Sequence, residues 1–395
     1  MKIYINEGSK DSGKRVVLDD LILTKDLPTT AGSKMLENFV SLFEAEVATR
    51  LQQAGYGIGG KVNVGEFGID LLGETSTFGA CVREDGTLVN AACESLKDGA
   101  FAAIGLDVNG APRRGAAQSQ LVCVKPTYGT VSRYGTIPVA CSGETVTVTA
   151  ASAAACREVL AVMAGHDDKD GTSLPAETCA KALEGRPIRK VAVASGLVAS
   201  ADAAVQENLA QFRSFLLESG IEVVEIDDEI LFAANTAWNV LMSAELCNNV
   251  SRYDGVKFGY RSNNYTNIDE LYTNSRTEAF GMLLKSAILF GSDVLSAENY
   301  KPVYDKSLRV RRVIVEALNS IFAGYDALLL PACSAQSYAQ ENLDPYFAFR
   351  ENLYTAPASI TGMPAVVVGG VQLMGPAFSE GSLLDLAQAY GKEEQ

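Results

Sequence analysis

The chain has 395 residues, of which 47% are hydrophobic and 21% are charged, so it can bury a large core without metals or disulfides. Its formal net charge of −15 argues against direct nucleic-acid binding, because a protein that grips phosphates needs clustered Lys and Arg. The single histidine, His166, excludes a multi-histidine metal site, and the eight cysteines form no Cys-x-x-Cys pair. We therefore expect reduced, structural cysteines and no bound metal or cofactor.

No apolar run reaches the roughly 18 residues of a membrane-spanning helix. The first residues also lack the apolar stretch of a signal peptide. These observations predict a soluble, cytoplasmic protein without membrane contact.

Helical and strand patterns alternate along the chain, which predicts an α/β fold. In chain order we expect a helix at 42–54, a helix at 150–164, a βαβ unit made of 189–194, 201–218 and 221–226, a helix at 306–323, strands at 326–330 and 364–369, and a last helix near 382–390. The segment 228–300 is mainly helical, and we interpret it as an insertion within a single domain that spans 1–395.

Two local patterns resemble known binding loops but fit them poorly. The turn after the first strand of the βαβ unit, at 194–197, lacks the Gly-x-Gly-x-x-Gly that cradles a pyrophosphate. The acidic stretch from His166 to Glu177 resembles a calcium loop, but histidine is a poor ligand for a hard cation. We interpret both as structural turns.

Several longer stretches carry a resemblance to a known family. In chain order they are Thr-Thr-Ala-Gly-Ser-Lys-Met-Leu-Glu-Asn-Phe at 29–39, Gly-Lys-Val-Asn at 60–63, Lys-Pro-Thr-Tyr-Gly at 125–129, Val-Ser-Arg-Tyr-Gly at 131–135, Arg-Tyr-Asp-Gly at 252–255 and Tyr-Thr-Ala-Pro at 354–357. In this order they resemble the amidase-signature family, and most of all the A subunit of the aspartyl/glutamyl-tRNA(Asn/Gln) amidotransferase. That resemblance implies a large mixed β-sheet covered by helices on both faces.

The family hydrolyses amides with a Ser–cis-Ser–Lys triad, in which a neutral lysine activates the bridging serine and this serine activates the nucleophile. The resemblance places Asp19 at the lysine, Thr87 at the cis-serine and Ala111 at the nucleophilic serine. Alanine has no attacking atom, and Pro112 removes a backbone N–H beside it. All three catalytic positions are therefore replaced.

Other positions carried over from the family are partly kept. Asp107 and Arg113, which brace the nucleophile loop in the family, are both present. The arginine that holds the substrate carboxylate corresponds to Ser286, and the aspartate that receives its amino group corresponds to Asn352. The substrate pocket is therefore expected to be degenerate, whereas its scaffold remains.

The residues leave three functions open. The first is a pseudo-amidase that acts by binding or as a scaffold, with amidotransferase B- or C-type subunits, an amidase paralogue or a second copy as partner, inside or outside a transamidation complex. The second is an active amidase or glutaminase component of a tRNA-dependent amidotransferase with an unrecognised site, for which the replacement nucleophiles would be Ser119, Cys123, Cys141 or Ser142. The third is a small-molecule sensor that uses the remodelled pocket.

Overall fold

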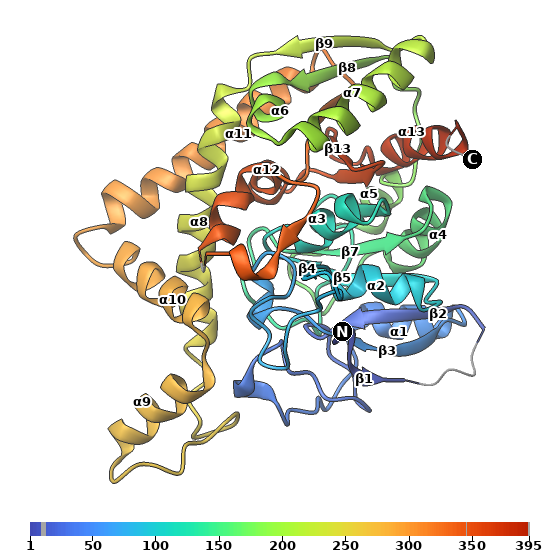
Figure 1. Cartoon of the computed structure of the whole chain (residues 1–395). Coiled ribbons are helices and arrows are strands. Elements are labelled where there is room, and N and C mark those ends of the chain that lie inside the picture. Colours follow the sequence, from blue (N-terminus) through green and yellow to red (C-terminus); the bar gives the residue numbers. More distant parts are fainter. Residues whose placement is uncertain (9–12, 345, 394–395) are drawn as a thin grey trace.

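The computed structural model describes residues 1–8, 13–344 and 346–393, and it shows helices packed around one large sheet (Figure 1). The strands are β1 (Tyr4–Glu7), β2 (Arg15–Asp19), β3 (Gly57–Val62), β4 (Thr87–Leu88), β5 (Ala102–Asp107), β6 (Val122–Lys125), β7 (Thr145–Ala150), β8 (Lys190–Ala194), β9 (Glu222–Ile226), β10 (Ala327–Pro331), β11 (Tyr338–Ala339), β12 (Ala365–Val368) and β13 (Val371–Met374).

The helices alternate with these strands over most of the chain. They are α1 (Glu46–Gln53), α2 (Ala91–Lys97), α3 (Ala111–Gln118), α4 (Ala153–Met163), α5 (Ala176–Lys181), α6 (Ser195–Ser200), α7 (Ala203–Glu218), α8 (Glu229–Val250), α9 (Ile268–Ala279), α10 (Met282–Val294), α11 (Lys306–Phe322), α12 (Phe347–Thr361) and α13 (Glu380–Glu393), with short η1 (Lys34–Leu36), η2 (Glu66–Gly68), η3 (Tyr300–Asp305) and η4 (Gln340–Asn342).

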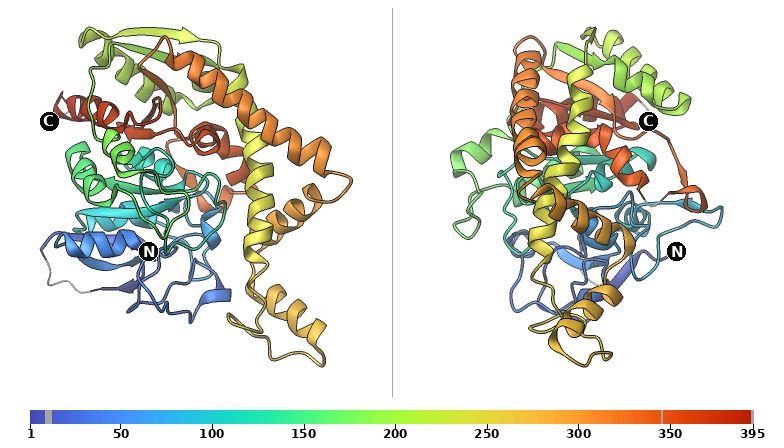
Figure 2. Two further views of the ribbon diagram at one scale, coloured as in Figure 1. Left: turned by 180° about the vertical axis from the view of Figure 1, so that it is seen from behind. Right: turned by 90° about the vertical axis from the view of Figure 1, so that its left-hand side faces the viewer.

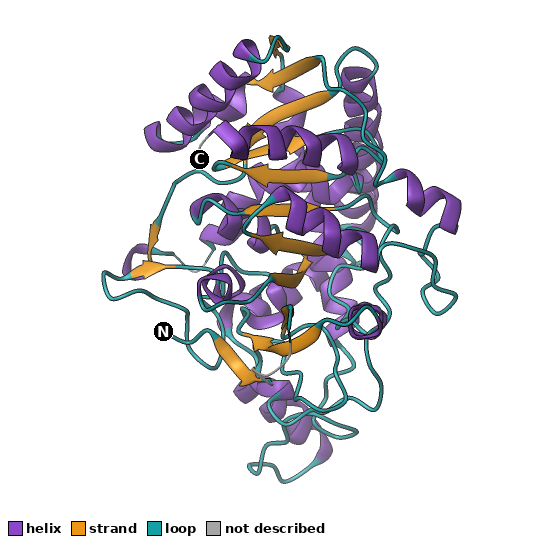
Figure 3. Ribbon diagram, turned by 90° about the vertical axis from the view of Figure 1, so that its right-hand side faces the viewer, coloured by secondary structure: helices purple, strands orange, loops and turns teal. Residues whose placement is uncertain are grey.

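Eleven of the described strands form one mixed sheet, in the order β1-β3-β2-β5-β7-β6-β12-β13-β10-β8-β9 (Figure 3). The pairs β2–β3, β2–β5, β8–β9 and β8–β10 are parallel, and the other neighbours are antiparallel. The C-terminal hairpin β12–β13 lies in the middle of the sheet, where Ala365 pairs with Lys125 of β6. The sheet therefore joins segments that are far apart in the sequence.

The central strands are buried on both faces, as expected for a sheet with helices on each side. All six residues of β5 and all six of β7 are buried. On one face α4 packs on β5, β6 and β7 and also contacts α1 and α13. On the other face Ala91 and Ala92 of α2 join Val17 and Ala103 in a separate apolar cluster.

The segment between β9 and β10 is helical. The 22-residue α8 packs against α10, α11 and α12, and α9 projects from the body of the molecule (Figure 2). Among the described residues α8 alone is long and apolar enough to cross a membrane, but 56% of its apolar window is buried inside the fold. The single tryptophan, Trp238, lies on this helix and is fully buried, so α8 packs as a core helix.

The predicted fold class is confirmed, and the predicted elements are all present with small shifts of their ends. The helix expected at 150–164 is α4, which starts later because Ser152 caps it by accepting from the Ala155 N–H. The helix expected at 201–218 is α7, which Asp202 caps in the same way, and the short α6 precedes it.

Candidate functional site

The turn between β5 and α3 is the centre of the candidate site, because it carries Ala111. Gly110 precedes the helix with φ +90°, a left-handed conformation that favours glycine. A Cβ on this glycine would lie 2.4 Å from the Thr355 Cβ of α12, so the turn is pressed against that helix. Ala111 is the first helical residue and is partly exposed, and Pro112 follows as the second.

A buried ion pair holds this turn in place. Arg113 donates to both carboxylate oxygens of Asp107, over 2.6 and 3.1 Å, and neither side chain is exposed. The Asp107 carboxylate also accepts the Gly110 N–H at 2.9 Å. Burial acts to raise the pKa of Asp107, but the charge and hydrogen bonds of Arg113, together with the charges of Lys125 and Arg114, hold it below its usual value. This geometry suits the bracing role that the resemblance assigns to the pair.

Arg113 also ties the turn to the C-terminal part of the chain. Its guanidinium donates to the Thr355 carbonyl at 3.0 Å, to the Ser359 hydroxyl at 2.9 Å and to Gln372 Oε1 at 2.9 Å. Together with Asp107, these acceptors give the fully buried guanidinium its hydrogen-bond partners. Such partners offset the free-energy cost of removing a charge from water.

Asp19 ends β2 and lies directly beside this turn. Its carboxylate accepts the Leu106 N–H at 3.1 Å. A Cβ on Gly105 would lie 2.7 Å from the Asp19 carboxylate and 3.3 Å from Pro112 Cγ, so Asp19 and Pro112 flank the same glycine. Burial raises the pKa of Asp19 to about 7, although the Leu106 N–H and Lys61 oppose the rise. The structure therefore brings position 19 to the start of α3, with a backbone amide as its hydrogen-bond donor.

Thr87 lies in a different environment. It belongs to β4, which pairs with β11 so that Thr87 faces Ala339. Its N–H donates to Asp85 Oδ1 at 2.9 Å and its carbonyl accepts the Arg83 N–H. Within the described residues these hydrogen bonds belong to the partly exposed turn at 83–88, and none joins Thr87 to Asp19 or to α3.

The two substrate-pocket positions lie on separate helices. Ser286 is on α10, and its hydroxyl lies 3.3 Å from the Tyr346 hydroxyl. Asn352 is fully buried on α12, and its carboxamide nitrogen, oriented by its hydrogen-bonding surroundings, faces the carbonyl oxygens of Asn109 and Ala348, 3.1 Å from each. Neither side chain carries a charge that could pair with the carboxylate or the amino group of a free amino acid.

Sequence reasoning missed two buried charged side chains, Arg114 on α3 and Asp70 in the segment that Arg114 contacts. Arg114 is fully buried and donates to the carbonyl oxygens of Leu71 and Asp70 and to the Thr355 hydroxyl, each over 3.2 Å. The Asp70 carboxylate accepts from the backbone and hydroxyl of Thr75, and its Oδ1 has no partner. Burial, and then the neighbouring Glu74, raise the pKa of Asp70 well above its usual value. The adjacent arginines 113 and 114 are the sequence signal that could have directed attention here.

A buried lysine, Lys61, lies in the same half of the sheet. Its ammonium donates to the Ile22 carbonyl and to the Thr29 hydroxyl, the latter at 2.9 Å, and lies 3.7 Å from the Asp20 carboxylate. Burial lowers the pKa of Lys61 to about 8 despite the attraction of Asp20. Because these partners occupy its ammonium group, we interpret Lys61 as a structural residue.

The replacement nucleophiles considered from the sequence are not activated. Burial raises the pKa of the Cys123 thiol to about 12 and raises that of Cys141 as well. The Ser142 hydroxyl accepts from Arg311 at 3.0 Å, and Ser119 caps the end of α3. The Ser142 N–H donates to the Glu245 carboxylate at 2.9 Å, but no hydrogen bond among the described residues joins that carboxylate to the Ser142 hydroxyl, and neither thiol has a lowered pKa.

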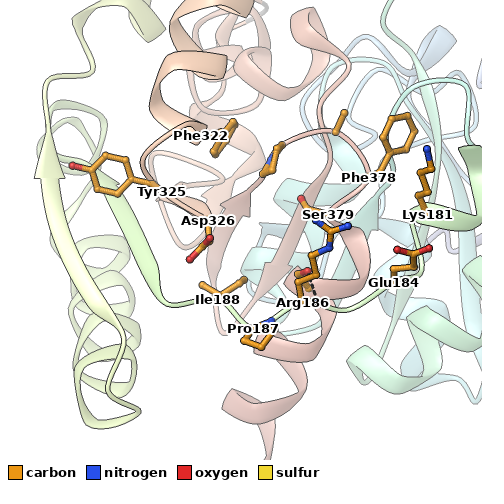
Figure 4. A pocket seen from close by; sticks show the side chains of 13 residues that line it. Lys181, Glu184, Arg186, Pro187, Ile188, Phe322, Tyr325, Asp326, Phe378 and Ser379 are labelled. Atoms are coloured by element: carbon orange, nitrogen blue, oxygen red, sulfur yellow. Dashed lines mark hydrogen bonds between the residues drawn. The ribbon is translucent and has the colours of Figure 1, made fainter.

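Two of the cavities that lie outside the triad positions are at the end of α11 and at the start of α10. One, of about 390 Å³, opens between the segment 184–188, the end of α11 and the loop before α13, where Arg186 donates its N–H to Ser382 (Figure 4). Its lining mixes cations and carboxylates. The other, of about 320 Å³, lies between Glu74, Thr75 and Met282 at the start of α10. No group of three His, Cys, Asp or Glu side chains in the described ranges could hold a metal ion.

Comparison with known proteins identifies the family. The model of the family described as Amidase matches residues 13–83 and 97–384. The chain belongs to the amidase family. The unmatched segment 84–96 contains Thr87, so the resemblance is weakest at the cis-serine position and stronger at Asp19 and Ala111.

Relatives with known names cover most of the chain. The A subunit of the glutamyl-tRNA(Gln) amidotransferase of Lachnoclostridium phytofermentans is 33% identical over 95% of this chain and 82% of its own length. The corresponding protein of Acinetobacter baumannii is 36% identical over 94% of this chain and 80% of its own. The crystal structure of the A subunit of the Thermotoga maritima glutamyl-tRNA(Gln) amidotransferase matches with a TM-score of 0.81 at 25% identity, covering 98% of this chain and 87% of that one.

More distant structures share the fold. The peptide amidase of Stenotrophomonas maltophilia matches with a TM-score of 0.75 at 22% identity, over 97% of this chain and 82% of that chain. The predicted resemblance to the amidase family and to its amidotransferase A subunits is therefore confirmed. The assignment of individual catalytic positions stays a prediction.

Proposed function

We propose that this chain is a catalytically inactive member of the amidase family that acts by binding rather than by hydrolysis. The observation that carries the proposal is the start of α3. There, the residue at the expected nucleophile position is Ala111, and the expected base position, Asp19, holds a carboxyl group bonded to the Leu106 N–H. Acyl transfer by a serine mechanism needs an attacking oxygen, which Ala111 lacks, and the family's relay needs a lysine amine, where this chain has the Asp19 carboxyl group.

The scaffold around the lost chemistry supports a retained binding role. The Asp107–Arg113 pair and its links to α12 and β13 keep the turn rigid although no nucleophile needs to be positioned. Arg114 and Asp70 occupy the neighbouring interior with structural contacts. We infer that selection has kept the shape of the molecule, which is what a partner recognises, and has not kept the residues of the catalytic triad.

The partner is proposed by analogy. The named relatives are each one subunit of a glutamyl-tRNA(Gln) amidotransferase, so a subunit of the B or C type, or an active amidase paralogue, is the partner that the family relationship favours. Self-association is the further possibility. The net charge of −15 makes a direct contact with tRNA unfavourable, and any role in transamidation would pass through such a partner.

A second candidate function is an active amidase or glutaminase that uses a different nucleophile. The names of the relatives favour it. It requires a hydroxyl or thiol next to a base close to Ala111, and the raised pKa of Cys123 and the contact of Ser142 with Arg311 argue against the nearest candidates.

The deciding experiment is an assay for ammonia release from glutamine, asparagine and simple amides. Stenotrophomonas maltophilia peptide amidase serves as the positive control for the amide substrates. We expect no turnover above the protein-free background for the unmodified chain or for Ala111→Ser, because Asp19 and Thr87 cannot complete the relay. Turnover gained only by Asp19→Lys, Thr87→Ser and Ala111→Ser together would assign the three positions directly.

Turnover by the unmodified chain would contradict the proposal. In that case Ser119→Ala, Cys123→Ala, Cys141→Ala and Ser142→Ala, each made singly, would identify the nucleophile. Activity that survives each of the four substitutions would show that the nucleophile is a different residue.

A further inference from the structure

The loop that joins α4 to α5 contains the single histidine of the chain, His166. Its ring reaches two acceptors within residues 166–174, which we call the acidic loop: Nδ1 lies 3.0 Å from the Leu174 carbonyl oxygen, and Nε2 lies 3.0 Å from Asp168 Oδ1. A carbonyl oxygen and an ionised carboxylate can only accept a hydrogen bond, so each ring nitrogen must carry a proton to complete its contact. A neutral imidazole has one N–H, so the described geometry is that of the doubly protonated imidazolium.

Charged and titratable groups from four parts of the fold lie around His166. They are Asp167, Asp168, Lys169 and Asp170 in the acidic loop, Glu46 and Arg50 on α1, Arg133 in the segment beneath the loop, and Cys179 on α5. The hydrogen bond with Asp168, and then that with the Leu174 carbonyl, raise the pKa of His166 above its usual 6.5. Both contacts are therefore fully present below pH 6.5, and the second ring proton is lost as pH rises through the raised pKa.

The two contacts of the ring respond differently when it loses a proton. The proton that remains goes to the stronger acceptor, and the Asp168 carboxylate accepts a stronger hydrogen bond than the neutral Leu174 carbonyl. Nδ1 then faces the Leu174 carbonyl with a lone pair, so this contact changes from attraction to repulsion. It is the contact that spans the acidic loop, because Leu174 lies eight residues after His166.

Leu174 also anchors the acidic loop to the body of the molecule. Its N–H donates to the Gly129 carbonyl at 2.9 Å, at the end of the Lys-Pro-Thr-Tyr-Gly stretch. The other end of the loop is held by Asp167, whose carboxylate accepts the Ser132 hydroxyl at 2.6 Å. Loss of the contact with His166 therefore acts on the Leu174 end of the loop.

We propose that His166 is a pH-dependent clasp of the acidic loop: its imidazolium holds Leu174 in place, and the neutral ring releases it. The inference goes beyond the proposed function, because His166 is not one of the expected catalytic positions and the clasp needs no partner. Water weakens the contacts of the ring, since 44% of the His166 side chain is exposed. The expected effect is therefore local opening of the loop rather than unfolding of the molecule.

Hydrogen exchange followed by mass spectrometry tests the clasp, with each rate divided by the intrinsic exchange rate at the same pH. We expect the protection of the segment that contains Leu174 to fall about threefold between about pH 5.5 and about pH 8.5 in the unmodified chain. Protection should stay level in His166→Gln, whose side chain does not titrate. The matched control, Glu218→Gln, removes an exposed carboxylate on α7 and should keep the fall seen in the unmodified chain.

Nuclear magnetic resonance of the single histidine gives a second readout that needs no variant. We expect the nitrogen shifts to show both ring nitrogens protonated below about pH 6, and the neutral ring protonated at Nε2. Asp168→Asn should lower the pKa of His166 toward that of the urea-unfolded chain. Three results would overturn the clasp: a neutral ring protonated at Nδ1, a pKa no higher than in the unfolded chain, or an equal fall in protection in the unmodified chain and in His166→Gln.

Discussion

At the scale of single residues, Asp19 is a buried carboxyl group whose titration can be tested directly. Asp19 remains at the end of β2 beside Gly105, where the family resemblance expects a lysine. Its carboxyl group is buried against the Leu106 N–H, and burial raises its pKa to about 7 from the usual 3.8. The folded state therefore binds a proton that the unfolded chain releases between these two values.

This difference predicts a pH-dependent effect of Asp19→Asn. Between about pH 4 and 7 the unfolded state binds fewer protons at Asp19 than the folded state, so the contribution of Asp19 to stability falls as pH rises through this window. Asparagine does not titrate and still accepts the Leu106 N–H. We expect Asp19→Asn to gain up to about 3 kcal/mol of unfolding free energy relative to the unmodified chain between about pH 5 and pH 8.

Urea unfolding at several pH values measures this gain. The control is Asp26→Asn, which removes an exposed carboxylate in the loop after β2. If the profiles of Asp19→Asn and the unmodified chain run parallel between about pH 5 and pH 8, the carboxyl group is not buried as described.

At the scale of elements, the start of α3 depends on contacts with a helix more than 200 residues away. Gly110 has φ +90°, and a side chain there would meet Thr355 of α12. The family motif marks this stretch as the nucleophile loop, but the tight approach to α12 cannot be predicted from local spacing. Helix α12 was not among the expected helices, because Pro357 lies inside it and proline usually interrupts a helix.

Gly110→Ala is expected to destabilise the protein by at least about 2 kcal/mol more than Gly220→Ala. Both glycines have positive φ, so backbone strain lowers the unfolding free energy of both variants by about 1 kcal/mol. Only at position 110 does the new Cβ collide, 2.4 Å from Thr355, whereas position 220 faces open space. Thermal and urea unfolding compare the two variants, and equal losses would show that α12 can move away at little cost.

At the scale of the whole molecule, the order of the strands determines which parts of the chain are joined in the sheet. The hairpin β12–β13 inserts between β6 and β10, so the strands of the N-terminal half and those of the βαβ unit meet only through C-terminal residues. On this basis we propose that the chain is a single domain, with the helical segment 228–300 as an insertion. Residues 1–185 alone would leave the edge of β6 unpaired.

A single domain predicts one cooperative unfolding transition. Trp238 is fully buried on α8 and donates its ring N–H to Asn109 at 2.8 Å, so its fluorescence reports on the joint between the insertion and the β5–α3 turn. We expect the urea midpoints from tryptophan fluorescence and from far-ultraviolet circular dichroism to coincide. Midpoints that differ would show that the helical segment unfolds separately and would divide the chain into two units.

The sequence by itself determined the fold class, the family and some of the regular elements, because hydrophobic periodicity, helix caps and family motifs are local properties. It also showed that Ala111 cannot attack an amide, since that follows from the side chain alone. Only the tertiary structure decided that Thr87 lies in a strand paired with β11 and that Arg114 is buried against the Asp70 and Leu71 carbonyls. These features depend on contacts between segments far apart in the chain, of the kind that pairs Lys125 with Ala365, and local spacing carries no information about them.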